Sequence, residues 1–303
     1  MSKQKQMSLI QFQERFQTDE SCREHLFKLR WPEGFVCPKC GHREYYSLPN
    51  RNQYQCKACK HQTSATAGTV FHKTHTPLRK WFWAIYLASH DKRGVSAQQL
   101  MNELELTYPT AWLILHKIRE AMGQRDANYQ LAGIVELDDA FFGAPTEDGK
   151  RGRGADKTPV IAGVSLDKQG RPQYVKMSVA GSIDGKTIKE FAKTNIVPCS
   201  SVFSDGLRSY NALSADYNHN PLVFDLEKNP DHLKWLHIMV SNAKAFIGGT
   251  YHGLDDKHLQ AYLNEFCFRT NRRKFKGQMF NRLVTACAHS NTITYKQLIS
   301  DVT

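Results

Sequence analysis

Residues 134–139, Ile134-Val135-Glu136-Leu137-Asp138-Asp139, form an apolar segment that runs directly into two acidic side chains. The periodicity changes at about residue 132, and the β-branched residues predict a strand here. Residues 159–165 and 173–179 are similar apolar segments, and Gly170-Arg171 between them is typical of a hairpin. We therefore expect three consecutive strands in this part of the chain.

Helix and strand alternate in the segment that follows. We expect a helix over residues 185–191, a fourth strand over residues 201–204 and a short fifth strand over residues 222–224. Further helices are expected over residues 232–246, 256–270 and 277–290. Three strands, a helix, a strand and then helices is the order of a ribonuclease-H-like α/β domain, in which helices flank a mixed sheet. We assign this domain to residues 129–303.

Two aspartates lie at the ends of predicted strands. Asp138 closes the first strand, and Asp205 closes the fourth strand 67 residues later. A buried strand end is unfavourable for a carboxylate unless it meets a cation or a hydrogen-bond donor, and two neighbouring carboxylates suit Mg²⁺ or Mn²⁺. Paired metal ions stabilise the attacking and the leaving oxygen in phosphoryl transfer. The alternative is that each aspartate only caps a turn, because Asp-Gly is a common turn sequence.

Four cysteines near the N-terminus form a second specific pattern. Cys37-Pro38-Lys39-Cys40 and Cys56-Lys57-Ala58-Cys59 are two C-x-x-C pairs with fifteen residues between them. Two such turns supply the four thiolates of a closed, structural Zn²⁺ site. We predict a zinc ribbon over residues 31–70, with strands over residues 45–48 and 53–55, and a helical region over residues 8–30 completes the first domain, residues 1–70. Four free cysteines or two disulfides are the alternative.

A helix-turn-helix unit is predicted over residues 71–128. Thr76-Pro77 and Ser96 are expected to start its first and second helices, and the third helix is expected over residues 108–122. The third helix of such a unit enters the major groove of DNA. The candidates for its exposed side are Thr107, Tyr108, Thr110, Lys117 and Arg119. A helical core without DNA contacts is the alternative.

The composition indicates a basic protein. Lysine and arginine outnumber aspartate and glutamate by 41 to 29, and the formal charge of +12 favours a polyanionic partner. A basic but ordinary surface is the alternative. The sequence contains no run of about 18 apolar residues, so we expect no membrane-spanning helix. The N-terminus has no apolar signal region. The other cysteines form no motif and are expected to be reduced, as in a cytoplasmic protein; they are Cys22, Cys199, Cys267 and Cys287.

Five stretches carry a resemblance to a known family. They are Cys37-Pro-Lys-Cys40, Val135-Glu-Leu-Asp-Asp139, Ser204-Asp-Gly206, Gly249-Thr-Tyr-His252 and Lys257-His-Leu-Gln-Ala-Tyr-Leu-Asn-Glu-Phe266. The chain resembles bacterial insertion-sequence transposases of the DDE type, in the subgroup that joins a zinc ribbon and a helix-turn-helix to a ribonuclease-H-like catalytic domain. The resemblance extends from about Phe12 to Leu298, and its last two stretches are particularly specific.

The resemblance implies a set of catalytic residues. Asp138 and Asp205 match the two metal-binding aspartates of the family. His237 lies at the third position, where many relatives have Glu, and Lys244 follows it by seven residues. Because imidazole is a softer ligand than a carboxylate, we expect weaker binding of the second metal ion and better activity with Mn²⁺ than with Mg²⁺. Asn242 is the second choice for this ligand.

Other polar residues have less specific roles. Strand alternation places Glu136 on the face of Asp138, as a substitute carboxylate, and Asp139 on the opposite face, although a structural role is expected for both. The resemblance implies that Lys244 contacts a DNA phosphate. The basic run Arg272-Arg273-Lys274, with Lys276 close by, suits the DNA backbone, and a solvated helix end is the alternative.

The resemblance thus implies a DNA transposase. The ribbon and the helix-turn-helix would bind the terminal inverted repeats, and the catalytic domain would cleave and transfer strands with Mg²⁺ or Mn²⁺. Pairing of two DNA ends needs at least two protomers, so we expect a homo-oligomer on double-stranded DNA, at the nucleoid of a bacterial cytoplasm. The alternatives are a DNA-binding regulator that no longer cuts, suggested by His237, and a nuclease that does not join strands.

Overall fold

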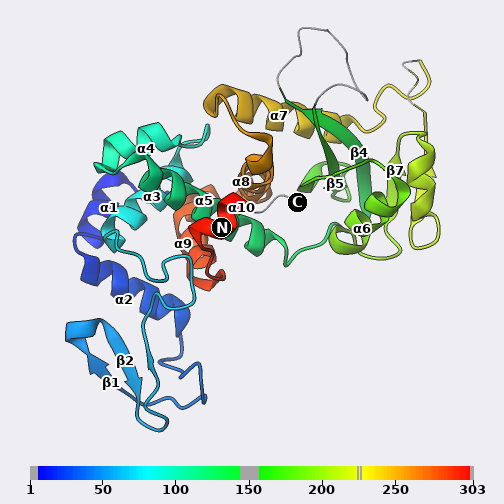
Figure 1. Ribbon diagram of the computed structural model, residues 1–303. Helices are drawn as coiled ribbons and strands as arrows, with labels where there is room; N and C mark the ends of the chain where they lie inside the picture. The colour runs from blue at the N-terminus through cyan, green and yellow to red at the C-terminus, as the bar shows by residue number, and fades with distance from the viewer. Residues whose placement is uncertain (1–5, 144–156, 224, 226, 301–303) are drawn as a thin grey trace. The chain divides into compact units, whose positions relative to one another are not determined.

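The computed structural model describes residues 6–143, 157–223, 225 and 227–300 of the 303-residue chain. The chain forms two compact units, one of Met1–Arg125 with Phe275–Thr303 and one of Asp126–Lys274 (Figure 1). The sequence assigned residues 275–303 to the catalytic domain, and here the structure differs. Helix α9 (Met279–His289) packs on helices of the first unit, so the second unit is inserted into the first.

The first unit contains the ribbon and most of the helices. Its strands are β1 (Tyr45–Leu48), β2 (Gln53–Cys56) and β3 (Gln62–Thr63), which form an antiparallel sheet, with η1 (Pro49–Arg51) in the turn. Its other helices are α1 (Leu9–Arg15), α2 (Asp19–Arg30), α3 (Leu78–His90), α4 (Ala97–Leu104), α5 (Tyr108–Asp126) and α10 (Tyr295–Ser300), and the turn η4 (Arg273–Gln278) precedes α9. The two strands predicted for the ribbon are therefore present.

Aromatic side chains join α9 to the N-terminal helices. The ring centroids of Phe12 and Phe280 lie 5.6 Å apart, and those of Phe16 and Phe82 lie 4.8 Å apart. All four side chains are at most 4% exposed. Burial of apolar surface drives folding, so these contacts explain why the C-terminal helix belongs to the first unit. The 149 residues between the two parts of this unit form the second unit.

Several helices start with a local capping hydrogen bond. Ser8 and Thr18 form capping boxes, so the predicted helical region over residues 8–30 is two helices. Ser96 caps α4 as predicted, through a 3.1 Å bond from the backbone N–H of Gln99. The predicted Thr76 cap is wrong. Pro77 precedes α3, and the carboxylate of Asp19 accepts the N–H of Arg79 at 2.9 Å instead.

Helix α5 is buried through its middle, and this corrects one expectation. Lys117 and Arg119 were expected on the exposed side, but they are only 8% and 2% exposed. The ammonium group of Lys117 donates to the carbonyl of Val70 at 3.3 Å. Every residue from 114 to 119 is buried, so neither basic side chain presents a surface to DNA. At the start of the helix, Thr107 and Tyr108 are exposed as expected.

The second unit is built on a five-stranded mixed sheet. In chain order its strands are β4 (Ile134–Phe142), β5 (Thr158–Leu166), β6 (Pro172–Val179), β7 (Ser201–Ser204) and β8 (Asn218–Pro221). The order across the sheet is β6-β5-β4-β7-β8, antiparallel between the first three strands of the chain and parallel from β4 to β7 and β8. The unit is therefore ribonuclease-H-like, as predicted.

The fifth strand lies earlier in the chain than predicted. The sequence placed it at residues 222–224, but β8 ends at Pro221, and Phe224 lies outside the described residues. Leu222 and Val223 are 45% and 70% exposed, so this apolar pair does not enter the sheet. Polar residues form β8 instead, because an edge strand needs only backbone partners on one side.

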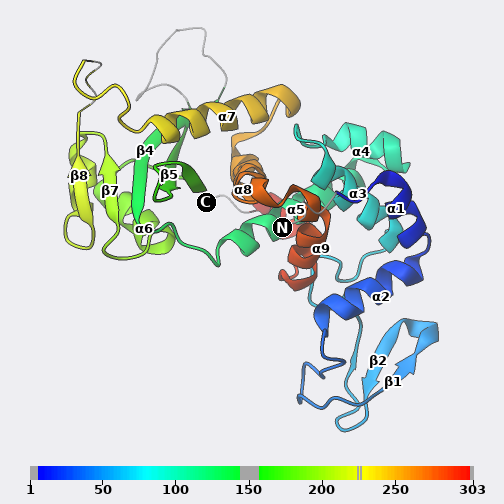
Figure 2. The same cartoon turned by 180° about the vertical axis from the view of Figure 1, so that it is seen from behind.

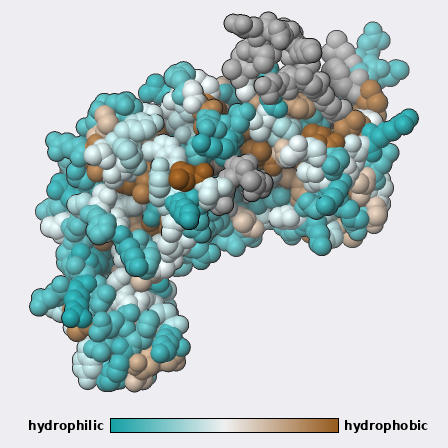
Figure 3. All heavy atoms as spheres, in the orientation of Figure 1, coloured by the Kyte–Doolittle hydropathy of each residue, from teal (hydrophilic) through white to brown (hydrophobic). Residues whose placement is uncertain are grey.

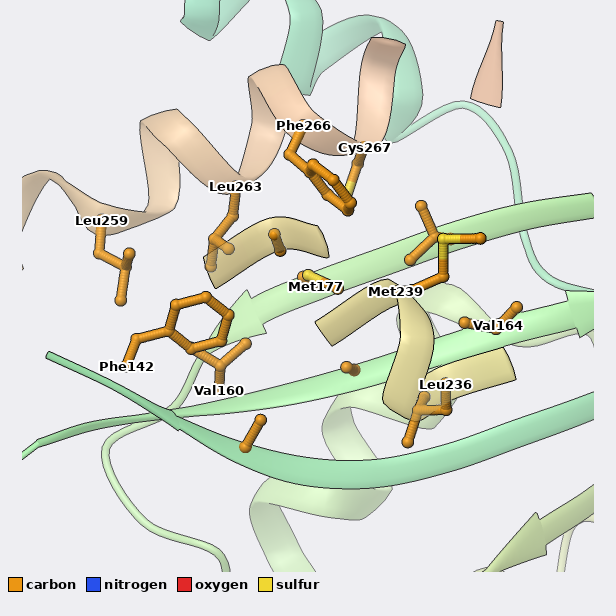
Figure 4. Close-up of a cluster of buried hydrophobic side chains, with 14 of the residues drawn as sticks. Phe142, Val160, Val164, Met177, Leu236, Met239, Leu259, Leu263, Phe266 and Cys267 are labelled. Carbon is orange, nitrogen blue, oxygen red and sulfur yellow. The ribbon is translucent and has the colours of Figure 1, made fainter. Parts of the chain in front are cut away.

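Helices cover both faces of this sheet, as two views show (Figures 1 and 2). Helices α7 (Lys234–Thr250) and α8 (Leu259–Asn271) pack on one face, where Phe142, Val160, Met177, Leu236 and Met239 belong to one buried cluster (Figure 4). On the other face, α6 (Gly185–Asn195) and the turn η2 (Arg208–Leu213) cover a second cluster. The remaining short helical turn is η3 (Asp256–His258).

Side-chain amides of α8 complete the free edge of β6. The backbone N–H of Val175 donates to the Asn271 amide oxygen at 2.8 Å, and the Asn271 amide donates back to the Val175 carbonyl at 3.0 Å. The amide oxygen of Gln260 likewise accepts the N–H of Val179 at 2.8 Å, and its amide nitrogen donates to the carbonyl of Met177 at 3.1 Å. Unpaired strand edges promote aggregation, so α8 protects this edge as well as packing on the sheet.

The face of the molecule drawn in Figure 3 is predominantly polar. Hydrophilic residues cover most of the face in Figure 3, and hydrophobic residues appear there in small groups. No helix within the described ranges has both the length and the apolar character that crossing a bilayer requires.

Candidate active site and metal centre

The four ribbon cysteines converge as the sequence predicted. The sulfur atoms of Cys37, Cys40, Cys56 and Cys59 all lie within 4.8 Å of one another. Cys37 and Cys59 are 3.6 Å apart, and so are Cys40 and Cys56. Tetrahedral zinc with Zn–S bonds of about 2.3 Å needs sulfur atoms roughly 3.8 Å apart. The four thiols therefore fit a structural Zn²⁺ ion.

The two cysteine turns have the same backbone geometry. The N–H groups of Cys37 and Cys56 donate to the carbonyls of His42 and His61, each at 2.9 Å. In the first turn Gly41 has φ +74°, a left-handed conformation that glycine adopts easily. In the second turn Lys60 has φ +58°, a left-handed conformation that is less favourable for a residue with a side chain. Both turns thus place two thiols on one side of the chain.

Asp138 lies within β4 and not at its end, which corrects the prediction. The strand continues to Phe142, because its antiparallel partner β5 pairs with it along the whole length. The parallel pairing with β7 stops earlier, at Glu136 and Phe203. Asp138 therefore lies just beyond the β7 ladder, where one side of β4 has no strand partner. Its side chain is 17% exposed, and one carboxylate oxygen accepts the N–H of Asp139 at 2.8 Å.

Asp205 follows the last residue of β7. Since Glu136 is opposite Phe203 in a parallel pair, Asp138 and Asp205 both lie two residues further along their strands. The Asp205 carboxylate accepts the N–H of Leu207 at 3.1 Å, so it also shapes the turn that the alternative interpretation proposed.

His237 lies beside Asp138. Its Nε2 atom is 3.7 Å from a carboxylate oxygen of Asp138, a distance that indicates an ion pair when the imidazole is protonated. The Asp138 carboxylate raises the pKa of His237, partial burial opposes this, and Glu136 adds to the increase. Helix α7 presents the imidazole to β4, so the structure brings together two of the residues that the resemblance selected.

Lys244 lies further along the same helix. Its Nζ atom is 5.4 Å from the ring centroid of Phe142, the last residue of β4. Seven residues are about two helical turns, so Lys244 projects from the same side of α7 as His237. Asn242 follows His237 by five residues and projects about 140° away around the helix. Burial lowers the pKa of Lys244. The helix geometry thus favours His237 over Asn242 as the partner of Asp138.

Glu136 has a role that the sequence did not indicate. The predicted alternation is correct, because Glu136 faces α7 whereas Asp139 contacts the Tyr210 hydroxyl on the other face. The Glu136 carboxylate is not exposed as a spare ligand. It accepts the backbone N–H of Leu236 at 2.7 Å, and the residue is 7% exposed. Strand alternation indicated only that this side chain lies on the same face as Asp138. Nothing in the sequence indicated its contact with Leu236.

The basic run after α8 is less available than expected. Arg272 is 6% exposed, and its guanidinium group lies 2.5 Å from the carboxylate of Asp126. Arg273 donates to the carbonyl of Pro172 and is half-buried. Both side chains are held by the protein because they follow the end of a buried helix. Lys274 is exposed and remains a candidate for contact with the DNA backbone.

Among the described residues, the four cysteines are the only compact group of three or more ligands of the kinds that commonly bind metals. Asp138, Asp205 and His237 do not form an equally tight group. A ribbon with four thiols, a helical unit and a ribonuclease-H-like unit with an aspartate on or after each of two neighbouring strands is the combination expected of the transposase class.

Comparison with known proteins agrees with this class. Residues 17–62 match a family model described as a transposase zinc-ribbon domain, and residues 130–271 match one described as an ISXO2-like transposase domain. Together these matches cover more than half of the chain. The chain belongs to the IS1595 family of insertion-sequence transposases.

One relative and two solved structures are also similar. "Uncharacterized protein in transposable element ISH50" of Halobacterium salinarum is 26% identical over 213 residues, which are 63% of this chain and 68% of that protein. The pre-cleavage Mos1 transpososome is 12% identical over 66% of this chain and 76% of that chain, with a TM-score of 0.26. A Mos1 transposase paired-end complex is 10% identical over 68% and 78%, with a TM-score of 0.20. At these scores the two structures carry no further inference.

Proposed function

We propose that this transposase binds the terminal inverted repeats of its insertion sequence and catalyses metal-dependent strand cleavage and strand transfer. Water would hydrolyse the phosphodiester at each end and release a 3′-hydroxyl, which would then attack a phosphodiester of the target DNA. The observation that carries the proposal is the 3.7 Å contact between His237 and Asp138, beside the strand that leads to Asp205.

The proposed metal site consists of Asp138, Asp205 and His237. Two carboxylates from neighbouring parallel strands are hard oxygen ligands, and the imidazole adds a nitrogen that Mn²⁺ accepts more readily than Mg²⁺. When bound, such an ion supplies a Lewis acid that stabilises charge on phosphoryl oxygens. His237 must be neutral to act as a ligand, so the contact with Asp138 that raises its pKa opposes metal binding in acid.

Lys244 is proposed to contact a DNA phosphate near this site. The residue is exposed, and it lies along α7 from His237, at the end of β4. A cation there would hold the DNA backbone in place without taking part in proton transfer.

DNA recognition is proposed for the first unit. The first residues of α5 are exposed, with Thr107 and Tyr108 at the end of the helix that usually contacts bases. On the ribbon, the exposed ring of Tyr46 has the ammonium groups of Lys57 and Lys60 within 5.4 and 5.9 Å. Aromatic and basic side chains together suit a nucleic acid. We further propose a homo-oligomer on DNA in the cytoplasm, because two DNA ends must be joined.

The test is a cleavage and strand-transfer assay on labelled DNA that carries the element's ends. We expect the parent protein to cleave and join these ends with Mn²⁺, and Asp138→Ala to lose both activities while still binding DNA. Asp216→Ala is the control, because this carboxylate is 52% exposed on the α6 side of the unit. Binding without cleavage by the parent under both Mg²⁺ and Mn²⁺ would favour a DNA-binding regulator.

The assignment of His237 has its own test. His237→Glu replaces the nitrogen ligand by a carboxylate, so the variant should use Mg²⁺ better relative to Mn²⁺ than the parent does. Titration of both ions in the cleavage assay measures this ratio. An identical Mg²⁺ dependence of the two proteins would remove His237 from the proposed metal site.

A further inference from the structure

The first turn of α7 has no cap of its own. The residue before the helix, Leu233, has φ +52°, and its side chain forms no capping hydrogen bond. The first N–H groups of a helix have no partner within the helix and need acceptors from elsewhere. Here Glu136 supplies the acceptor from the middle of the sheet, through its 2.7 Å bond to the N–H of Leu236.

This cap joins the two elements that carry the candidate site. Glu136 precedes Asp138 by two residues on β4, and Leu236 is the immediate neighbour of His237 on α7. The contacts Glu136–Leu236, Asp138–His237 and Phe142–Lys244 follow one another in the same order along both elements. A shift of α7 along β4 would therefore change all three together.

We propose that Glu136 is a positioning residue, which fixes the first turn of α7 on β4 and thereby holds His237 beside Asp138. The catalytic part of this inference rests on the proposed function, and the anchoring part does not. Direct metal binding by Glu136 is the competing role, and the N–H of Leu236 already occupies a carboxylate oxygen.

The neighbouring residue provides a matched control. Val135 lies next to Glu136 on β4 and is fully buried, but it faces the opposite cluster, away from α7. Val135→Ala should lower the overall stability of the unit without releasing the first turn of α7. Glu136→Ala should release that turn, and Glu136→Gln should retain it, because the amide oxygen accepts the same N–H.

The anchoring is tested by hydrogen–deuterium exchange of the full-length protein, without DNA or metal. We expect the first-turn amides of α7 to exchange about fivefold faster in Glu136→Ala than in the parent, which is the usual effect of a lost helix cap. Glu136→Gln should exchange like the parent, and Val135→Ala should show no selective change at this turn. Unchanged exchange in Glu136→Ala would overturn the proposal.

The catalytic consequence is tested by the single-turnover cleavage rate at saturating Mn²⁺. We expect a loss of about 10- to 100-fold in Glu136→Ala, as for other residues that orient a ligand, with Glu136→Gln close to the parent and DNA affinity unchanged. If Glu136→Gln lost as much activity as Glu136→Ala while its exchange stayed normal, Glu136 would be a metal ligand and the proposal wrong. A parent protein that does not cleave would refute the proposed function, and the exchange data would still judge the anchoring.

Discussion

Asp126 and Arg272 form a buried ion pair with a distance of 2.5 Å between the guanidinium nitrogen and the carboxylate oxygen. Asp126 is the residue at which the chain enters the second unit, and Arg272 lies two residues before the chain leaves it. The amide of Asn271 and the ammonium group of Lys176 bind Asp126 as well, the latter at its backbone carbonyl. The two ends of the inserted unit are thus held together by one polar cluster.

Replacement of Arg272 by alanine should strongly destabilise the second unit. It leaves the Asp126 carboxylate buried without its charge partner, which typically costs about 3–5 kcal/mol. Lys189→Ala is the control, because its pair with Asp216 is about half exposed and should contribute less than about 1 kcal/mol. Urea unfolding of both variants measures the two free energies. Equal losses would show that the buried pair does not stabilise the fold.

Removal of one zinc ligand should unfold the ribbon. Cys40→Ser is expected to purify with less than one equivalent of zinc, because a closed structural site needs all four of its ligands, and such sites supply about 10–16 kcal/mol of apparent binding free energy. Zinc content by elemental analysis and exchange of the ribbon amides measure the effect. Cys199→Ser is the matched control, since this exposed cysteine lies outside the cluster. Full zinc occupancy in Cys40→Ser would contradict the four-cysteine site.

A methyl group at Gly206 should disturb the loop that holds Asp205. A Cβ atom there would lie 2.5 Å from a methyl carbon of Val223, and valine has little freedom to rotate away. We expect Gly206→Ala to cost about 1–3 kcal/mol, as overpacking usually does. Gly181→Ala, where nothing lies within 4 Å, is the control. Addition of Val223→Ala should restore stability to Gly206→Ala, and failure to do so would show that this contact is not the cause.

Acid should destabilise the first unit through His25. Burial, together with the charges of Arg15 and Lys28, lowers the pKa of this imidazole to about 4. Because the unfolded chain binds a proton below about pH 6.5 that the folded chain does not, the free energy of unfolding should fall from pH 6.5 to pH 4. The free energy of unfolding should fall by at most about 3 kcal/mol over this pH range.

The His25 contribution is measured by comparing unfolding of the parent and of His25→Phe across this pH range. The phenylalanine should keep the packing against Phe16 and Phe82, whose ring centroids lie 5.2 and 5.9 Å from that of His25. The variant should therefore lose less stability in acid than the parent. Parallel curves for the two proteins would show that His25 does not cause the acid dependence.

Features that depend on neighbouring residues could be predicted from the sequence. The two C-x-x-C pairs predicted a cluster that the structure confirms, because the ligand spacing within each turn is a local property. The first four strands of the second unit, the helix before the fourth strand and the Ser96 cap are also confirmed, since periodicity and capping act over a few residues.

The predictions failed where side-chain exposure depends on distant segments. Lys117 and Arg119 are basic and were expected at the surface, but both are buried, and Lys117 donates to the carbonyl of Val70, 47 residues earlier. Arg272 was expected to face DNA, and Asp126, 146 residues earlier, binds it instead. No local pattern can report such partners, because the partner is selected only when the chain folds.

The sequence by itself determined the zinc ligands, the order of strands and helices along the ribonuclease-H-like unit, and the family. Each follows from residue types within short segments of the chain. Tertiary structure decided the rest of the site. It continued β4 beyond Asp138, placed His237 3.7 Å from that carboxylate and directed Glu136 to the start of α7. The contacts of Asp138 with His237 and of Glu136 with Leu236 join residues about 100 positions apart. Burial of the sheet face against α7 brings them together.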